Sequence, residues 1–477
     1  MKMKINKYLV LLLSISIAFL GVQELRAKID NNSDRRNSFI GSAYSENESY
    51  KILEKICKEY GGRLAGSASS QKTIQLLSNE LASNNIFYQI DKFTIPGWQR
   101  GKANYIKLLH PLKKDIIGYT IGSSPAIDKS ILDVEYANAG FTEEYLKINA
   151  KDKAIIIDLD NAASGNNLTR SQAIKIAKDN GANAVLFSGN KDSSMVLMSA
   201  GSFDGASTGI PAFAISKYDS ELLKNSIINN ENPKVEIYST DTLRDINLQN
   251  LRAIFPGKST KKVVLMAHYD SWDISQGAVD NGIGIAILID VAKLIKKYYP
   301  NNLYTIECIW TDGEEIGLHG AKKLFDKIKD STIAVINVDM TGSPTGINVM
   351  GYESMINFSE NFINSLPGYI WNDGVKNYPW LRSDHAPFLT YGIPSFTFNA
   401  YNDQKMYKHY HSIGDNFELI NPRYISDAVA IIGLFTVELA NFKDIEKHKL
   451  NKQSTIKMLK KHKLDLQLKK TGEWKED

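Results

Sequence analysis

Acidic and histidine residues that could bind metal ions recur in the second half of the chain, each at the end of a short apolar run or in the loop after one. They are His268, Asp280, Glu314, Glu315, Asp339 and His411. Imidazole nitrogens and carboxylate oxygens are the usual ligands of catalytic zinc. Adjacent carboxylates such as Glu314 and Glu315 repel each other unless a cation or a shared proton is present. The set therefore indicates a hydrolase site with two metal ions.

The apolar runs that precede these residues are short and rich in β-branched side chains, which is typical of buried strands. They cover residues 262–267, 303–311, 332–338 and 393–398, and a helix-like stretch covers residues 282–299. Alternating strands and helices predict an α/β fold with a mixed, mostly parallel sheet sandwiched by helices. Because ligands gather at the carboxyl ends of strands in such sheets, we expect the acidic and histidine residues to meet there.

The residue types suggest a division of roles, although each position has a simpler interpretation. His268 could be a structural histidine, but Asp270 follows on the same side of an extended chain and can orient its imidazole. Asp280 could cap the helix that follows, or its two oxygens could bridge two cations. Glu314 and Glu315 could lie in an exposed turn. In a metal site, Glu315 would be the ligand and Glu314 the base that moves a proton between water and the leaving amine.

Length, composition and charge exclude some classes of function. The chain has 477 residues, of which 43% are hydrophobic and 23% charged, so it can bury a large core and is expected to hold two domains. Its net charge of +4 gives no case for nucleic-acid binding. Much of the positive charge lies in a basic tail, residues 444–477, which we expect to be a solvated helix or a frayed end. A membrane-surface or partner contact is the alternative for this tail.

The N-terminus has the pattern of a signal peptide, residues 1–27. Lys2, Lys4 and Lys7 precede an apolar run that is short for a membrane span, and a cleavage site follows Ala27. Residues 28–48 would then be a pro-segment or linker. We expect an exported protein, secreted or periplasmic, with no stable membrane span after cleavage. A retained signal anchor is the competing interpretation.

The region between the N-terminus and the acidic and histidine residues divides into two parts. Residues 49–112 carry two amphipathic helices and two strand-like runs, and we assign them to the first part of the catalytic domain. Residues 113–242 form separate strands, none of which ends in a histidine or carboxylate cluster, so we expect an inserted domain. Residues 243–443 would complete the catalytic domain. A disulfide between Cys57 and Cys308 is possible but not favoured, because Cys308 lies in a predicted central strand.

Several strings of residues, in this order and spacing, resemble the secreted di-zinc exopeptidases of the aminopeptidase and glutamate carboxypeptidase type, and most closely the carboxypeptidase Q type. They are Tyr60-Gly-Gly-Arg-Leu-Ala-Gly-Ser67, Pro96-Gly-Trp-Gln-Arg-Gly101, His268-Tyr-Asp-Ser-Trp-Asp273, Gly277-Ala-Val-Asp-Asn281 and Glu314-Glu-Ile-Gly317. The resemblance covers residues 49–442. It implies the zinc-exopeptidase fold, which is phosphorylase/hydrolase-like, and an inserted β-rich protease-associated domain.

The resemblance also implies a role for each candidate residue. Two zinc ions would be bound, one by His268 and Asp339 and the other by Glu315 and His411, with Asp280 bridging them. The Tyr410-His-Ser-Ile-Gly-Asp415 string matches the family pattern and selects His411 rather than His409 as the ligand. Glu314 would be the general base, Asp270 would orient His268, and Tyr410 would stabilise the oxyanion. The family often has a cis peptide bond after the bridging aspartate, here before Asn281.

The implied reaction is hydrolysis of the peptide bond in dipeptides or short peptides with a free terminus. The shared metal site does not distinguish aminopeptidase, carboxypeptidase and dipeptidase activities, and a homodimer stays open. Asp384 is a candidate for holding a free α-amino group, or it belongs to a turn before Pro387. Alternatives are a catalytically inactive, receptor-like or peptide-binding relative, which would be expected to lose ligands, and a glutaminyl cyclase-like enzyme of the same fold.

Overall fold

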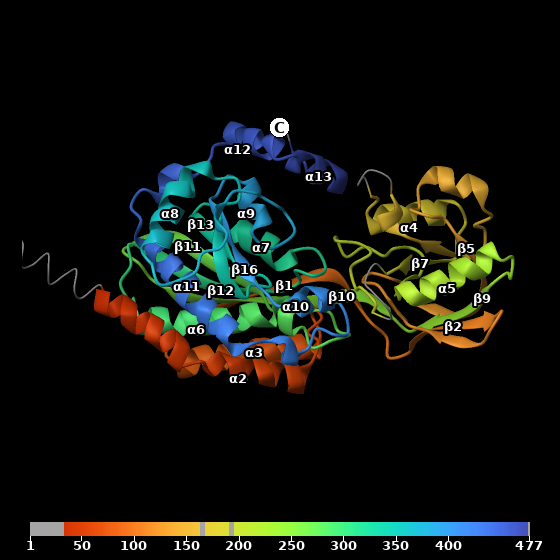
Figure 1. The fold of residues 1–477 in the computed structure, drawn as a ribbon, viewed down its shortest axis with the longest axis horizontal. Coiled ribbons are helices and arrows are strands. Elements are labelled where there is room, and N and C mark those ends of the chain that lie inside the picture. Colours follow the sequence, from red (N-terminus) through yellow and green to blue (C-terminus); the bar gives the residue numbers. More distant parts are fainter. Residues whose placement is uncertain (1–32, 163–166, 190–194, 476–477) are drawn as a thin grey trace, which may run out of the picture.

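The chain folds into two units that lie side by side in the computed structural model (Figure 1). The structure describes residues 33–162, 167–189 and 195–475. The first unit comprises residues 33–99 and 242–475, and the second unit comprises residues 104–239. Each unit is built on one eight-stranded sheet. The expected signal peptide, residues 1–27, lies outside the described residues.

The sheet of the first unit is mixed, as expected, and its centre is parallel. Its strands lie in the order β1 (Tyr88–Gln99), β10 (Thr242–Phe255), β12 (Tyr304–Thr311), β11 (Ser259–His268), β13 (Thr332–Asn337), β16 (Ser395–Tyr401), β14 (Ser343–Asn348) and β15 (Gly374–Lys376). The four strands β12, β11, β13 and β16 pair in parallel. Antiparallel pairs add β10 and β1 on one side and β14 on the other. The expected α/β fold is confirmed.

Helices cover both faces of this sheet because its central strands are apolar on both faces. Alternate residues of β11 point to opposite sides. Val263 and Leu265 lie in the larger core with α6 (Ile283–Tyr298) and α11 (Pro422–Asn441). Val264 and Met266 pack instead against α7 (His319–Ile328) and α9 (Ala386–Thr390). Continuous apolar strands of this kind are typical of buried parallel sheets.

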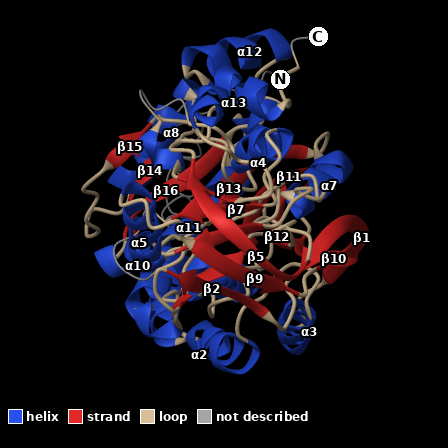
Figure 2. Cartoon of the chain, turned by 90° about the vertical axis from the view of Figure 1, so that its right-hand side faces the viewer, coloured by secondary structure: helices blue, strands red, loops and turns tan. Residues whose placement is uncertain are grey.

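The second unit has its own sheet and core. Its strands lie in the order β3 (Lys114–Ile116), β2 (Asn104–His110), β9 (Lys234–Ser239), β5 (Ile127–Tyr136), β6 (Ala154–Ile157), β7 (Ala184–Ser188), β8 (Ala212–Ile215) and β4 (Gly118–Thr120). Figure 2, with this unit toward the viewer, shows β2, β9, β5 and β7 in that sequence. The helices α4 (Arg170–Asp179) and α5 (Lys217–Ile228) pack into separate clusters on this sheet.

The expected position of β2 is wrong. We placed this strand in the catalytic domain, which was expected to extend to residue 112. In the structure β2 pairs with β9, and Ile106 and Leu108 are buried in the core of the second unit. Buried and exposed residues alternate along β2, and this pattern would suit a strand of either sheet. Only the strand with which β2 pairs assigns it to one unit.

Both ends of the described chain pack on the first unit. Residues 33–45, part of the expected pro-segment or linker, are helical, and Phe39 is buried against Tyr298 and Tyr299. The basic tail forms α12 (Lys452–Lys461) and α13 (Leu464–Thr471), whose apolar side chains join the larger core. Among the described residues, α11 is the one helix long and apolar enough to span a membrane, and most of it is buried inside the protein.

Neither cysteine forms a disulfide, as expected. Cys57 and Cys308 are both free and buried in the larger core of the first unit. Burial raises the pKa of the Cys57 thiol to about 12, so this thiol stays protonated near neutral pH. Both residues therefore act as small apolar side chains.

Candidate metal centre and active site

The order of the parallel strands explains how distant residues meet. His268 ends β11, Glu314 and Glu315 follow β12, and Asp339 follows β13. These three strands are neighbours with β11 in the middle, so their carboxyl ends lie at one edge of the sheet. Asp280 comes from the segment that leads into α6, and His411 comes from the loop after α10 (Gln404–His409).

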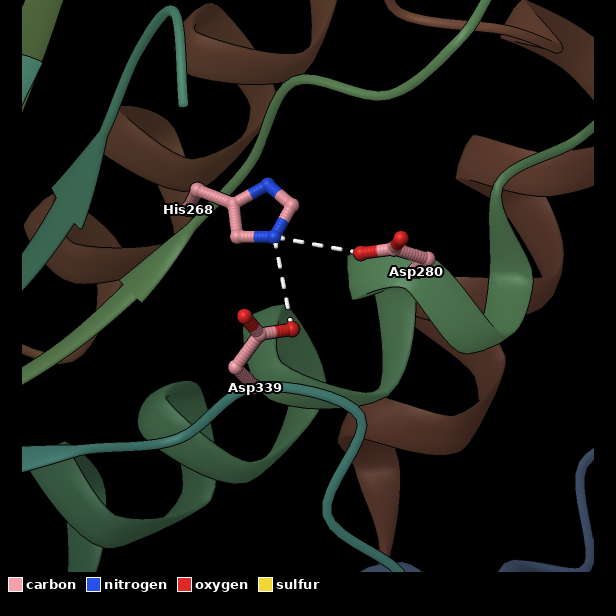
Figure 3. A group of neighbouring side chains, drawn as sticks. All are labelled: His268, Asp280 and Asp339. Atoms are coloured by element: carbon pink, nitrogen blue, oxygen red, sulfur yellow. Dashed lines mark ion pairs between the residues drawn. The ribbon is translucent and has the colours of Figure 1, made fainter. Parts of the chain in front are cut away.

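Two groups of potential ligands form at this edge. In the first, His268 Nε2 lies 3.2 Å from Asp280 Oδ1 and 3.5 Å from Asp339 Oδ1 (Figure 3). In the second, His411 Nε2 lies 3.0 Å from Asp280 Oδ2 and 2.9 Å from Glu315 Oε2. Within each group the ligand atoms all lie within 4.8 Å of one another. The structure thus brings together all five expected ligands, and Asp280 belongs to both groups.

Several atoms of these groups are buried without a hydrogen-bond partner. They are His268 Nε2, Glu315 Oε1 and Asp339 Oδ1. Buried polar atoms are normally hydrogen-bonded, because leaving one unpaired costs about 1–3 kcal/mol. His268 Nε2 is close to two carboxylates, yet its geometry does not make a hydrogen bond to either. Nitrogen and oxygen atoms that converge without forming hydrogen bonds are better suited to bind a divalent cation than to bind one another.

The pKa values of the site residues are also shifted, in directions that bound cations would reverse. Burial and the neighbouring Asp280 raise the pKa of Glu315 to about 7, although His411 opposes the shift. Burial and the charges of Asp339 and Glu315 raise the pKa of Glu314 well above its usual range. Burial lowers the pKa of His411, but Glu315 and Asp280 outweigh it and raise that pKa to about 10. A bound cation would favour ionised carboxylates and neutral imidazoles.

Comparison with known proteins shows what this region is similar to. Residues 250–436 match the model of peptidase family M28. The chain is 26% identical to aminopeptidase YwaD of Bacillus subtilis, with 90% of this chain and 89% of that protein covered. It is 24% identical to carboxypeptidase Q of Rattus norvegicus, with 89% and 92% covered. The expected class, a metallo-exopeptidase, is confirmed.

Solved structures share the fold of this chain. A peptidase M28 precursor from Shewanella amazonensis superposes with a TM-score of 0.74 at 23% identity, covering 87% of this chain and 98% of that one. The structure described as BSAP, a zinc aminopeptidase from Bacillus subtilis, gives a TM-score of 0.66 at 22% identity, covering 84% and 96%. The similarity therefore extends over both units of the chain.

In this site, Asp270 links the strand of His268 to the two glutamates. His268 Nδ1 lies 3.1 Å from the backbone oxygen of Asp270 and 3.6 Å from its carboxylate. That carboxylate accepts hydrogen bonds from the backbone N–H groups of Glu314 and Glu315, at 3.1 and 3.2 Å. We expected Asp270 to orient His268 through its carboxylate. The hydrogen bond to the ring instead comes through the backbone, and the carboxylate holds the turn that carries both glutamates.

Arg63 is a supporting residue that the sequence did not reveal. Its side chain is fully buried and donates to the backbone oxygens of Tyr269, Gln276 and Gly277, at 2.7 Å each. The first of these carbonyls follows His268, and the other two precede Asp280. Arg63 therefore ties the segment after one ligand to the segment before another. Its only sequence signal was its place in the 60–67 string, which gives no partner.

Three further residues, whose contacts the sequence did not reveal, hold the ligands in place. Asp415, almost fully buried, accepts hydrogen bonds from the backbone N–H groups of Val279 and Asp280, at 2.7 and 3.1 Å. The Asn281 side chain donates to the Val338 carbonyl, directly before Asp339. Ser383 donates to Asp339 Oδ2 at 2.7 Å. The expected cis peptide bond between Asp280 and Asn281 is present.

Other candidates lie near the site in different settings. The Tyr410 ring stacks on His411 with ring centres 3.7 Å apart, and burial raises the pKa of its hydroxyl well above the usual range. His409 belongs to neither ligand group. Asp384 is fully buried and accepts a hydrogen bond from Thr311, and burial raises the pKa of its carboxyl to about 7. A side chain closed off in this way is poorly placed to meet an α-amino group.

Proposed function

We propose that this protein is a di-zinc exopeptidase that hydrolyses dipeptides or short peptides with a free terminus. The observation that carries the proposal is the position of Asp280. Its two oxygens face different ligand groups, one with His268 and the other with His411. A carboxylate shared in this way is how one residue can bridge two metal ions. His268 with Asp339, and His411 with Glu315, would complete the two sites.

The residues around these sites have roles that follow from their positions. Bound zinc would polarise the scissile carbonyl and lower the pKa of a water molecule. Glu314 would accept the proton from the attacking water and donate it to the leaving amine. Its carboxylate is kept close to the ligands because Asp270 holds its backbone N–H. Tyr410, stacked on His411, would donate its hydroxyl to the oxyanion that forms on the carbonyl oxygen.

Zinc is the proposed metal because imidazoles and carboxylates form both ligand groups. The similarity to a zinc aminopeptidase from Bacillus subtilis supports the same choice. Export remains part of the proposal, on the basis of the basic and apolar segments in residues 1–27. The active protein would then work outside the cytoplasm on peptides released there.

A substrate panel tests this proposal. Purified protein is incubated with zinc and with dipeptides, N-blocked dipeptides and longer peptides, and the released amino acids are measured. We expect hydrolysis of the free dipeptides, with loss of activity after chelation and recovery with zinc. Protein that binds two zinc ions per chain and hydrolyses none of these peptides would refute the proposed function.

A further inference from the structure

The two histidine ligands differ in how their backbones are held. His268 ends β11 and is fixed by the hydrogen bonds of the sheet. His411 lies in a loop, and its backbone adopts the left-handed region, with a φ of 53°. Residues that carry a side chain rarely adopt this region, which costs about 1–3 kcal/mol and persists only where the surroundings fix it. The position of His411 therefore depends on its contacts more than that of His268 does.

The second unit supplies one of these contacts through its backbone. The carbonyl of His411 accepts a hydrogen bond from the backbone N–H of Met198, at 2.8 Å. Met198 follows β7 in the second unit, and its side chain is fully buried. The hydroxyl of Ser412 lies 3.7 Å from Met195 Sδ in the same segment. Figure 1 shows α10, which leads into the loop of His411, on the side of the first unit toward the second.

Trp272 contacts the ring of the same histidine. Its indole meets the His411 imidazole in an edge-to-face arrangement, with ring centres 6.2 Å apart. Trp272 follows β11 in the first unit, but its side chain is 2% exposed and belongs, with Met198, to the apolar cluster that α4 joins in the second unit. Because buried side chains are closely packed, this cluster fixes the indole that faces His411.

The supports of the other ligand group lie in the first unit. The ring of His268 contacts the backbone oxygen of Asp270, and Asp339 accepts a hydrogen bond from Ser383. In the described part of the chain, no hydrogen bond or ion pair joins His268 or Asp339 to the second unit. A change in how the second unit packs on the first should therefore affect one ligand group and leave the other as it is.

We propose that the second unit is a positioning element of the metal centre, which acts through Met198 and Trp272 on His411 and sets the zinc affinity of that site. This inference rests on the proposed function and adds to it a dependence of one zinc site on the docking of the second unit. Because coupling between two binding events is reciprocal, zinc bound by His411 should in turn tighten that docking. The zinc site of His268 should be independent of it.

Two background variants isolate the sites, because each removes a ligand of one group only. They are Glu315→Ala, which keeps the group of His268, and Asp339→Ala, which keeps the group of His411. Trp272→Leu is added to each, and zinc affinity is measured by competition with a chromophoric chelator. In the Asp339→Ala background we expect a loss of about 10- to 100-fold, the usual effect of a residue that orients a ligand. In the Glu315→Ala background the affinity should not change.

Trp98→Leu is the matched control. Trp98 is buried in the same apolar cluster, and its indole N–H donates to the Ser124 carbonyl at 3.0 Å. Among the ring contacts of the described residues, however, Trp98 makes none with His411. Trp98→Leu should therefore lower the stability at least as much as Trp272→Leu, as measured by urea titration, but leave zinc affinity unchanged in both backgrounds. Circular dichroism checks the folding of every variant.

Met198→Pro and Met198→Ala test the backbone contact. Both shorten the buried side chain, but only proline also removes the N–H that His411 accepts. In the Asp339→Ala background, zinc affinity should fall further with proline than with alanine. Hydrogen exchange of the otherwise unchanged protein measures the reciprocal effect. Zinc should slow the exchange of residues 195–200, and Trp272→Leu should reduce this slowing.

The outcomes separate the inference from the proposed function. If Trp272→Leu weakens zinc binding equally in both backgrounds, or in neither, the inference is overturned and the di-zinc function stands. The same holds if Trp98→Leu matches its effect, because loss of stability alone would then explain it. If Trp272→Leu does not fold, the two Met198 variants decide, and equal affinities for them overturn the inference. Zinc binding in neither background would refute the proposed metal sites, and the inference with them.

Discussion

Replacement of Arg63 tests whether the metal site depends on a buried cation outside the ligand set. In Arg63→Met, the carbonyls of Tyr269 and Gln276 lose the donors that Arg63 supplies, whereas the Gly277 carbonyl keeps the backbone N–H of Gly282. Methionine approximates the length of the arginine stem but cannot donate a hydrogen bond. The change therefore removes the tie between the segments of His268 and Asp280 and leaves most of the space filled.

The size of the effect follows from the two carbonyls that are left without a donor. A buried carbonyl left without a donor costs about 1–3 kcal/mol. The variant also no longer has to bury a charge, which offsets part of this cost, because burial disfavours the charged guanidinium and lowers the pKa of Arg63. Taking the low end for each of these two carbonyls, we expect the free energy of unfolding to fall by about 2 kcal/mol. Zinc affinity should fall about 10- to 100-fold, as for other residues that orient ligands.

Urea denaturation of the zinc-free protein measures the first effect, and competition with a chelator measures zinc affinity. Arg423→Met is the control, because the Arg423 side chain is 75% exposed. It should change the stability by less than about 1 kcal/mol. Arg63→Lys should be intermediate, since one ammonium cannot reach all three carbonyls. An Arg63→Met protein with wild-type stability and wild-type zinc affinity would refute this account of Arg63.

The remaining predictions concern the base and two buried groups. Glu314→Gln should keep two zinc ions but lose about 100- to 10,000-fold in kcat. Metal analysis measures the zinc content and steady-state kinetics measures kcat. Loss of zinc would mean that the roles of Glu314 and Glu315 are reversed. Asp415→Asn should weaken zinc binding, because the Asp415 carboxylate accepts hydrogen bonds from the backbone N–H groups of Val279 and Asp280. Chelator competition measures the zinc affinity, and an unchanged affinity would argue against this role of Asp415. Burial raises the pKa of Asp290 to about 7, so the folded state favours its protonated form and wild-type stability falls as pH rises from about 4 to 7. Asp290→Asn should remove that loss and exceed the wild type by about 2–4 kcal/mol at pH 8 in urea titrations, whereas parallel pH profiles would contradict it.

The residues that could be predicted from the sequence are those that follow buried strands. His268, Glu314 and Asp339 each come directly after an apolar run, and parallel strands bring their own ends together. The local sequence pattern therefore predicted both the residue types of the site and their place at the carboxyl ends of the strands. His411 was harder, because no strand ends beside it in the sequence. Its choice over His409 came from the resemblance to a family.

The supporting residues could not be predicted because their partners are distant in the chain. Arg63 contacts carbonyls that lie more than 200 residues away. Nothing in the neighbouring sequence distinguishes it from an exposed arginine. Asp415 likewise binds the backbone of Val279 and Asp280, which offer no side-chain signal.

The positions of the chain ends and of β2 were missed for a related reason. Residues 33–45 were expected as a pro-segment or linker, but they contribute the buried Phe39. The tail was expected to be solvated, yet Met458 and Leu464 join the core. A few apolar residues spaced along a charged segment do not reveal whether a complementary surface exists. That surface is formed only when the central sheet and its helices have folded.

The central claim is that one carboxylate, Asp280, bridges two zinc ions. Anomalous scattering at the zinc edge from crystals of the zinc-loaded protein tests it most directly. We predict two peaks of similar height, one beside His268 and Asp339 and the other beside His411 and Glu315, with Asp280 contacting both. A single peak at saturating zinc, or two peaks of which Asp280 contacts only one, would contradict the claim.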